Sequence, residues 1–289
     1  MNDGFSYEQL CEKIENITKQ YPFVAKCRIG ESVCGRDIYA LSVGNYRNVT
    51  LFVGGFGARD ALTSQILLEY ANRLCHAFKT KTGLAGVNVS SALMSRGLSI
   101  VACLNPDGLE IASRGAEGAG EYADFVREIS GGDTSLWNAN AKGIDISKNF
   151  NSGRDKISLY EANRGVFGPA ASGYGGFAAE SEPETAALVN FCEKNNIHHA
   201  IALLGRGKAI NWMSETCSPE NSKTMAKILS VCCGYGIANS RSADEFGSFK
   251  DWFSENHKKC ALSLGVKDVG GFEKTYRKLE EMLVIGTII

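Results

Sequence analysis

The stretch VTLFVGGFGARDALTSQILLEYANRLCHAF, residues 49–78, decides the class of fold. Its opening residues are β-branched or apolar, which predicts a strand from Val49 to Val53. Gly54 and Gly55 then mark a turn, and the apolar spacing becomes helical from about Asp60 to Phe78. A strand that passes through a short turn into a long helix is the repeating unit of an α/β fold.

The same alternation continues on both sides of this stretch. Ser6 and Gln9 form a capping-box pattern before a helix that ends at Tyr21-Pro22, and Ser181 and Glu184 form a second one. We expect further strands at 23–29, 37–43, 99–103, 200–204 and 260–264, and further helices near 183–195, 219–233 and 272–283.

Two other segments carry glycine and turn signals. Asn105-Pro106-Asp107-Gly108 predicts a turn, and residues 115–176 predict a loop-rich region. Taken together, the patterns predict a single α/β domain over residues 1–289, with a mixed, mainly parallel sheet flanked by helices on both faces. In such a sheet the functional site lies beyond the carboxyl ends of the strands, here the loops after Val53, Leu204 and Leu264.

The composition excludes several classes of protein. The net charge is −1 without a strongly basic stretch, so we expect no nucleic-acid partner. No apolar run approaches the roughly 20 residues of a membrane span, and the first residues do not resemble a signal peptide. The ten cysteines form no C-x-x-C pair, which favours free thiols, mostly in the core, and a cytoplasmic protein without a membrane partner.

Six short motifs occur in one order between about Tyr7 and Leu283. They are Ile29–Ser32 with Gly35-Arg36, Asn105–Gly108, Trp137–Asn140, Gly143–Asp145 with Asn149-Phe150, Ser181–Thr185, and Lys250–Phe253. In this order they resemble the zinc carboxypeptidases of the carboxypeptidase A type. The likeness is greatest to the bacterial branch that cleaves γ-D-glutamyl-diamino-acid bonds in peptidoglycan peptides. The resemblance implies the zinc carboxypeptidase fold, and zinc as the cofactor of the family.

The positions that should bind zinc are changed. The family's His-x-x-Glu motif falls on the run from Gly57 to Asp60, and its third ligand, a histidine, falls on Leu204. Only Asp60 keeps a group that can coordinate a metal. A catalytic zinc site takes about three protein ligands and an open position for water. We therefore expect no zinc and no other cofactor.

The remaining family positions are altered as well, so we expect no catalytic residues. Ser263 stands where the family has its glutamate general base, and Asn138 where it has the arginine that stabilises the oxyanion. The Asn-Arg pair that holds the substrate carboxylate aligns with Ser147-Lys148, which keeps a charge but loses the bidentate fork. Arg59 matches the arginine that lies within the family's first zinc motif.

The four histidines offer no obvious replacement ligands. His76 and His257 are expected at the surface. His199 precedes Leu204 by five residues, about 16 Å along a strand, and the adjacent His198 points to the opposite face. Ser263 has no neighbouring base in the sequence, and both it and Cys260 are expected to be core residues.

Five polar residues are candidates for ligand binding: Arg59, Asp60, Asp145, Lys148 and Arg206. They could form a polar pocket that still binds a ligand. The alternative, which we favour, is that they pair with one another at a helix start, where Asp60 would also cap the backbone.

Three hypotheses for function follow. The first is a catalytically inactive homologue that retains a pocket for a small peptide or cell-wall fragment. The second is an active metallocarboxypeptidase or γ-D-glutamyl-diamino-acid peptidase with relocated ligands. The third is a scaffold that uses the fold only as a surface, with the old site filled by side chains such as Leu204.

Overall fold

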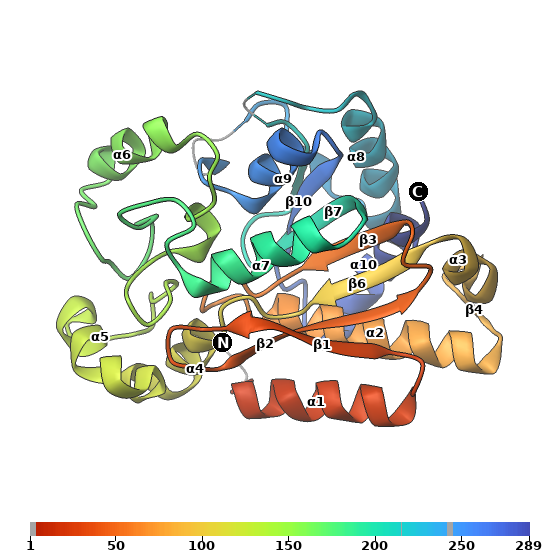
Figure 1. Cartoon of the computed structure of the whole chain (residues 1–289), viewed down its shortest axis with the longest axis horizontal. Helices are drawn as coiled ribbons and strands as arrows, with labels where there is room; N and C mark the ends of the chain where they lie inside the picture. The colour runs from red at the N-terminus through yellow and green to blue at the C-terminus, as the bar shows by residue number, and fades with distance from the viewer. Residues whose placement is uncertain (1–3, 215, 242–244) are drawn as a thin grey trace.

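The computed structural model describes residues 4–214, 216–241 and 245–289. A twisted sheet runs through the centre of the described chain, with strand order β1-β2-β6-β3-β7-β10-β8-β9 (Figure 1). Its strands are β1 (Ala25–Glu31), β2 (Asp37–Gly44), β3 (Val49–Val53), β6 (Gly97–Val101), β7 (Ile197–Leu204), β8 (Ala209–Asn211), β9 (Gly236–Ile237) and β10 (Ala261–Gly265). A separate small hairpin joins β4 (Gly83–Leu84) to β5 (Val87–Asn88).

The pairing of the strands confirms the mixed sheet. The central strands β6, β3, β7 and β10 run parallel to one another, and β8 runs parallel to β9. The β1–β2, β2–β6 and β10–β8 pairs are antiparallel.

Helices cover both faces of the sheet, as the sequence predicts (Figure 1). The longer ones are α1 (Tyr7–Gln20), α2 (Ala61–Thr80), α7 (Pro183–Lys194), α8 (Glu220–Cys233) and α10 (Phe272–Ile288). The shorter ones are α3 (Val89–Ser95), α4 (Pro106–Arg114), α5 (Ala123–Ser130), α6 (Arg154–Asn163) and α9 (Phe249–His257), with 3₁₀ turns η1 (Gly115–Tyr122) and η2 (Ile146–Lys148).

Strand β3 shows how the sequence builds two cores. All five of its residues are buried. Phe52 packs into the core under α1, α2, α8 and α10, whereas Leu51 and Val53 pack into the core under α7 and α9. Side chains alternate across a strand, so an apolar run of this kind can be buried only when both faces are covered.

The two predicted capping boxes have different outcomes. The box at α1 is confirmed, because Ser6 Oγ accepts from the Gln9 N–H and Gln9 Oε1 accepts from the Ser6 N–H. The box at α7 is wrong. That helix begins after Glu182 without a side-chain cap, and Ser181 Oγ instead donates to the Glu182 carboxylate at 2.9 Å.

The glycine-rich parts contain more helix than the sequence suggests. Asn105 is the N-cap of α4, and its Oδ1 accepts from the Gly108 N–H at 2.8 Å, so the predicted turn is a helix start. The predicted loop region at 115–176 contains η1, α5, η2 and α6. Helix α6 buries only Ile157 and Glu161, which leaves almost no apolar periodicity to detect.

The carboxyl ends of the central strands meet at one edge of the sheet. Val53 of β3 pairs with Ala202 of β7, and Leu204 pairs with Gly265 of β10. The loops after these strands are therefore neighbours, as the site prediction requires. In the described part of the chain, no helix has the length and apolar character needed to cross a membrane.

Candidate functional site

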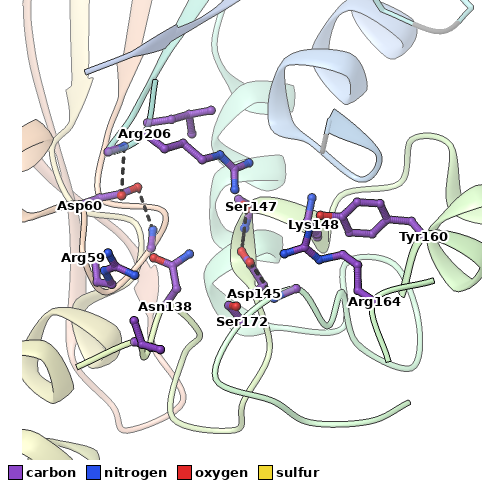
Figure 2. Close-up of a pocket in the computed structure, with 15 residues that line it drawn as sticks. Arg59, Asp60, Asn138, Asp145, Ser147, Lys148, Tyr160, Arg164, Ser172 and Arg206 are labelled. Carbon is purple, nitrogen blue, oxygen red and sulfur yellow. Dashed lines mark hydrogen bonds between the residues drawn. The ribbon is translucent and has the colours of Figure 1, made fainter. Parts of the chain in front are cut away.

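A cleft of ≈ 360 Å³ lies beyond the carboxyl ends of β3 and β7. The five predicted ligand-binding residues all line it: Arg59, Asp60, Asp145, Lys148 and Arg206. The altered family positions Gly57, Asn138 and Leu204 line it as well. Figure 2 shows Arg59 and Asp60 on one side of the cleft and Lys148 on the other. The structure thus places the five predicted residues around one cleft.

Asn138 fills the space at the first metal-ligand position of the family. A Cβ atom built on Gly57 would lie 2.2 Å from Asn138 Oδ1 and 2.7 Å from its Cγ, far inside normal contact. The two segments are also joined by a hydrogen bond of 3.1 Å from the Ala58 N–H to the Asn138 carbonyl. Any side chain at position 57 would therefore have to displace the Asn138 amide.

Asp60 joins the two loops that follow β3 and β7. Its carboxylate accepts from the Gly57 N–H at 3.1 Å and from the Gly205 N–H at 3.0 Å. The side chain makes no capping bond to α2, so the predicted cap is wrong. Burial raises the Asp60 pKa to about 6, although the two backbone donors and the charge of Arg206 act in the opposite direction.

The three metal positions do not fit a catalytic zinc ion. Gly57 has no side chain and Leu204 is a hydrocarbon, so Asp60 is the one donor that remains. That carboxylate already accepts two backbone hydrogen bonds. Within residues 4–214, 216–241 and 245–289, no three or more His, Cys, Asp or Glu side chains are grouped so that they could hold a metal ion.

Ser263, at the general-base position, is buried, as expected for a core serine. Its Oγ donates to Glu245 Oε1 at 3.2 Å, and both residues line a smaller hollow of ≈ 20 Å³ that shares Leu204 and Arg206 with the cleft. Lys250 forms an ion pair with Glu245 at 3.4 Å, while burial raises the Glu245 pKa. Glu245 lies outside every motif, so the sequence carries no signal for it.

The carboxylate of Asp145 is held by the fold. It accepts from the Ser147 N–H at 3.1 Å, the Ser147 hydroxyl at 2.6 Å and the Gly173 N–H at 3.0 Å. Asp60 is likewise held by backbone donors. Both carboxylates therefore accept hydrogen bonds from the fold, and the pairing of the five candidates with one another stays a prediction.

Lys148 is buried at 1% exposure, and its Nζ lies 4.5 Å from the centroid of the Tyr160 ring. Arg164, at the end of α6, places its Cζ 5.4 Å from the same centroid. Both Tyr160 and Arg164 line the cleft. Helix α6 carries no family motif and little apolar periodicity, so the sequence carries no signal for these two residues.

None of the four histidines lines the cleft. His199 is buried, its Nε2 lies 3.2 Å from Thr50 Oγ1 and 2.7 Å from the Gly286 carbonyl, and burial lowers its pKa to about 4. His198 and His76 are exposed. His257 corrects the prediction, because it is half-buried and packs against Trp252 and Phe253.

The cysteines agree only in part with the prediction. All ten are free thiols. Five are buried rather than most of them: Cys75, Cys103, Cys192, Cys233 and Cys260. Cys27 is exposed on the edge strand β1.

The order of motifs, the sheet and the position of the cleft agree with one family of enzymes. The sequence profile described as zinc carboxypeptidase matches residues 10–277. The chain belongs to the zinc carboxypeptidase family. This zinc carboxypeptidase homologue is 26% identical over 263 residues to gamma-D-glutamyl-L-diamino acid endopeptidase 1 of Lysinibacillus sphaericus, covering 90% of this chain and 65% of that protein.

It is also 27% identical over 252 residues to the uncharacterized protein YqgT of Bacillus subtilis, covering 86% of this chain and 66% of that protein. The chain thus spans slightly less than two thirds of the length of these two relatives. Among solved structures, bovine thrombin-activatable fibrinolysis inhibitor in complex with tick carboxypeptidase inhibitor has a TM-score of 0.72 at 19% identity, over 98% of this chain and 95% of that one. Murein-tripeptide amidase MpaA from Escherichia coli O157 has a TM-score of 0.57 at 16% identity, over 91% and 92% of the two chains. These likenesses show the shared fold.

Proposed function

We propose that this zinc carboxypeptidase homologue binds an anionic, peptide-like ligand in its cleft and does not hydrolyse it. The observation that carries the proposal is the side chain of Asn138 in the space beside Gly57. With Leu204 at the third position, the site lacks the ligands that would lower the pKa of a bound water to about 7 and polarise a carbonyl group.

The cleft supports a binding role over a purely structural one. A scaffold would have the old site filled by side chains, whereas a volume of ≈ 360 Å³ remains open beside Leu204. The guanidinium-bearing residues Arg59, Arg164 and Arg206 are exposed along it. Both lining carboxylates accept hydrogen bonds from the fold, so the groups offered to a ligand are mainly cationic.

The relatives favour a peptide with a free carboxylate as the ligand. One of them is named for its action on gamma-D-glutamyl-L-diamino acids. A fragment of a peptidoglycan peptide would bring carboxylates to a cationic cleft, where arginine is the preferred partner.

The ten free thiols favour a reducing compartment, and we place the protein in the cytoplasm. Fractionation of the source cells tests this location, and recovery of the protein outside the cytoplasmic fraction would refute it.

The test of function combines binding with hydrolysis. The purified chain is titrated with a γ-D-glutamyl-lysine peptide by calorimetry at low salt, and the peptide is then analysed by mass spectrometry after incubation with added zinc. We expect binding that weakens in Arg206→Gln, and an intact peptide. Cleavage that a chelator abolishes would overturn the proposal in favour of an active enzyme. A lack of binding would leave the fold as a scaffold.

A further inference from the structure

The cations of the cleft are divided between its two sides. Arg59 lies with Asp60 on one side, and Arg164 lies with Tyr160 and Lys148 on the other (Figure 2). The guanidinium groups of Arg164 and Arg206 extend toward the space between the sides. Arg59, Arg164 and Arg206 are exposed, and in the described part of the chain neither Arg59 nor Arg164 takes part in an ion pair.

The positions at which the family holds a carboxylate are used differently here. The Ser147 hydroxyl donates to Asp145 at 2.6 Å, and Lys148 is 1% exposed, with its Nζ against the Tyr160 ring. These two residues offer a ligand little direct contact. The guanidinium group of Arg164 also lies against the Tyr160 ring. It presents an exposed fork of N–H donors to the cleft.

We propose that Arg164, positioned on the Tyr160 ring, is an anion-binding residue, and that the cleft takes a ligand with two anionic groups. One group binds Arg164 on the α6 side, and the other binds Arg206 on the β7 side. This inference rests on the proposed function, since it names the class of ligand that the same cleft binds. Carboxylates and phosphates share the required chemistry, because both accept two parallel N–H bonds from a guanidinium group.

The arrangement around Tyr160 favours a ligand over a purely internal role for Arg164. A cation that lies over an aromatic ring keeps its N–H donors free at the edge of the guanidinium plane, while the ring restricts its rotamers. Lys148 adds a buried cation 4.5 Å from the centroid of the same ring. A competing structural role exists, because an arginine at the end of a helix also interacts favourably with the helix dipole. The experiment must separate the two.

Matched pairs of ligands make this separation. Glutarate, pimelate and azelate carry two carboxylates at increasing separation, and the monoamide of each has nearly the same shape but one charge. The phosphate monoester of 6-hydroxyhexanoate is tested beside the diacids and their monoamides, as a ligand with a phosphate in place of one carboxylate. Each compound is titrated by calorimetry at low ionic strength into the wild-type chain, Arg164→Gln, Arg164→Lys and Arg206→Gln. Arg277→Gln, an exposed arginine on α10, is the control.

We expect at least one diacid or the phosphate ester to bind about tenfold more tightly than its singly charged counterpart. Arg164→Gln should abolish this advantage but leave the monoamide affinity unchanged, and Arg164→Lys, which lacks the fork, should restore only part of it. Arg206→Gln should weaken the binding of the doubly charged compounds and of the monoamides. A purely structural Arg164 would instead be rescued fully by lysine.

Two other outcomes separate this inference from the proposed function. Monoamides that bind without any advantage for a second charge, or an advantage that survives in Arg164→Gln, would overturn the two-anion inference alone. An absence of binding by every compound, in a wild-type chain that unfolds cooperatively, would overturn the proposed function and this inference with it.

Discussion

Asn138 Oδ1 lies 2.2 Å from the point where a Cβ atom on Gly57 would stand, so a larger side chain at position 57 would have to displace the Asn138 amide. The two positions are 81 residues apart in the sequence, and a backbone hydrogen bond between Ala58 and Asn138 fixes them together. The loss of the first metal ligand and the change at the oxyanion position therefore form one packing arrangement.

The first prediction follows from this contact. Gly57→His should lower the free energy of unfolding by about 1–3 kcal/mol, because the imidazole must displace the Asn138 amide. Gly57→His combined with Asn138→Gly should recover part of that loss. Urea denaturation measures both. Gly168→His is the control, since a Cβ there meets no atom within 4 Å. Equal losses at positions 57 and 168 would show that the contact is unimportant.

The second prediction concerns the bridge made by Asp60. Asp60→Ala leaves the Gly57 and Gly205 N–H groups without their acceptor, and should cost about 1–3 kcal/mol for each donor that stays buried. Asp60→Asn keeps one acceptor oxygen and should cost less. Hydrogen exchange of the two glycine amides should speed up in Asp60→Ala. Unchanged exchange at both amides would contradict the bridge.

The third prediction uses Glu184, which is fully buried near Asp107 and accepts from the Val33 N–H at 3.1 Å. Burial, then repulsion by Asp107, raises its pKa to about 8, well above the value near 4.3 for an unfolded chain. A raised carboxyl pKa stabilises the fold below the unfolded pKa, and this contribution is lost as the pH rises through the folded pKa.

The stability of the wild type should therefore fall between about pH 4.3 and pH 8 relative to Glu184→Gln. Urea denaturation of both chains across this range measures the difference. A difference between wild type and Glu184→Gln that stays constant with pH would contradict the assigned pKa.

The fourth prediction is a restoration of the metal site. Leu204→His alone should bind no zinc, because position 57 still lacks a ligand. Gly57→His, Asn138→Gly and Leu204→His together supply two histidines beside Asp60, which is the minimum set for zinc. Metal titration by calorimetry should detect binding in the triple variant only. Equal binding by Leu204→His would show that ligands other than these three hold the metal.

Much of the site was accessible from the sequence because it rests on local signals. The apolar run of β3 and the strand before Leu204 place their following loops at one edge of the sheet, and the flanking motifs locate Gly57 and Ser263 within the family pattern. Side-chain direction was not accessible. The sequence predicts that Asp60 caps a helix, yet its carboxylate accepts a hydrogen bond from the Gly205 N–H. These two residues are 145 positions apart, and their contact depends on how β3 and β7 pair.

The missing part of the site has a different cause. Tyr160 and Arg164 lie on a helix that buries few apolar residues, so neither periodicity nor a motif marks them. Their importance arises only when the chain folds α6 against the cleft and places both Lys148 and Arg164 on one aromatic ring.

The central claim is that this member of the zinc carboxypeptidase family lacks the metal chemistry of the family, and the zinc content of the purified chain tests it most directly. The wild type is dialysed against excess zinc, washed, and measured by atomic emission beside the triple variant that restores two histidines. We predict a molar ratio of zinc to protein chain near zero for the wild type. A ratio of about one zinc per wild-type chain that survives washing would contradict the account.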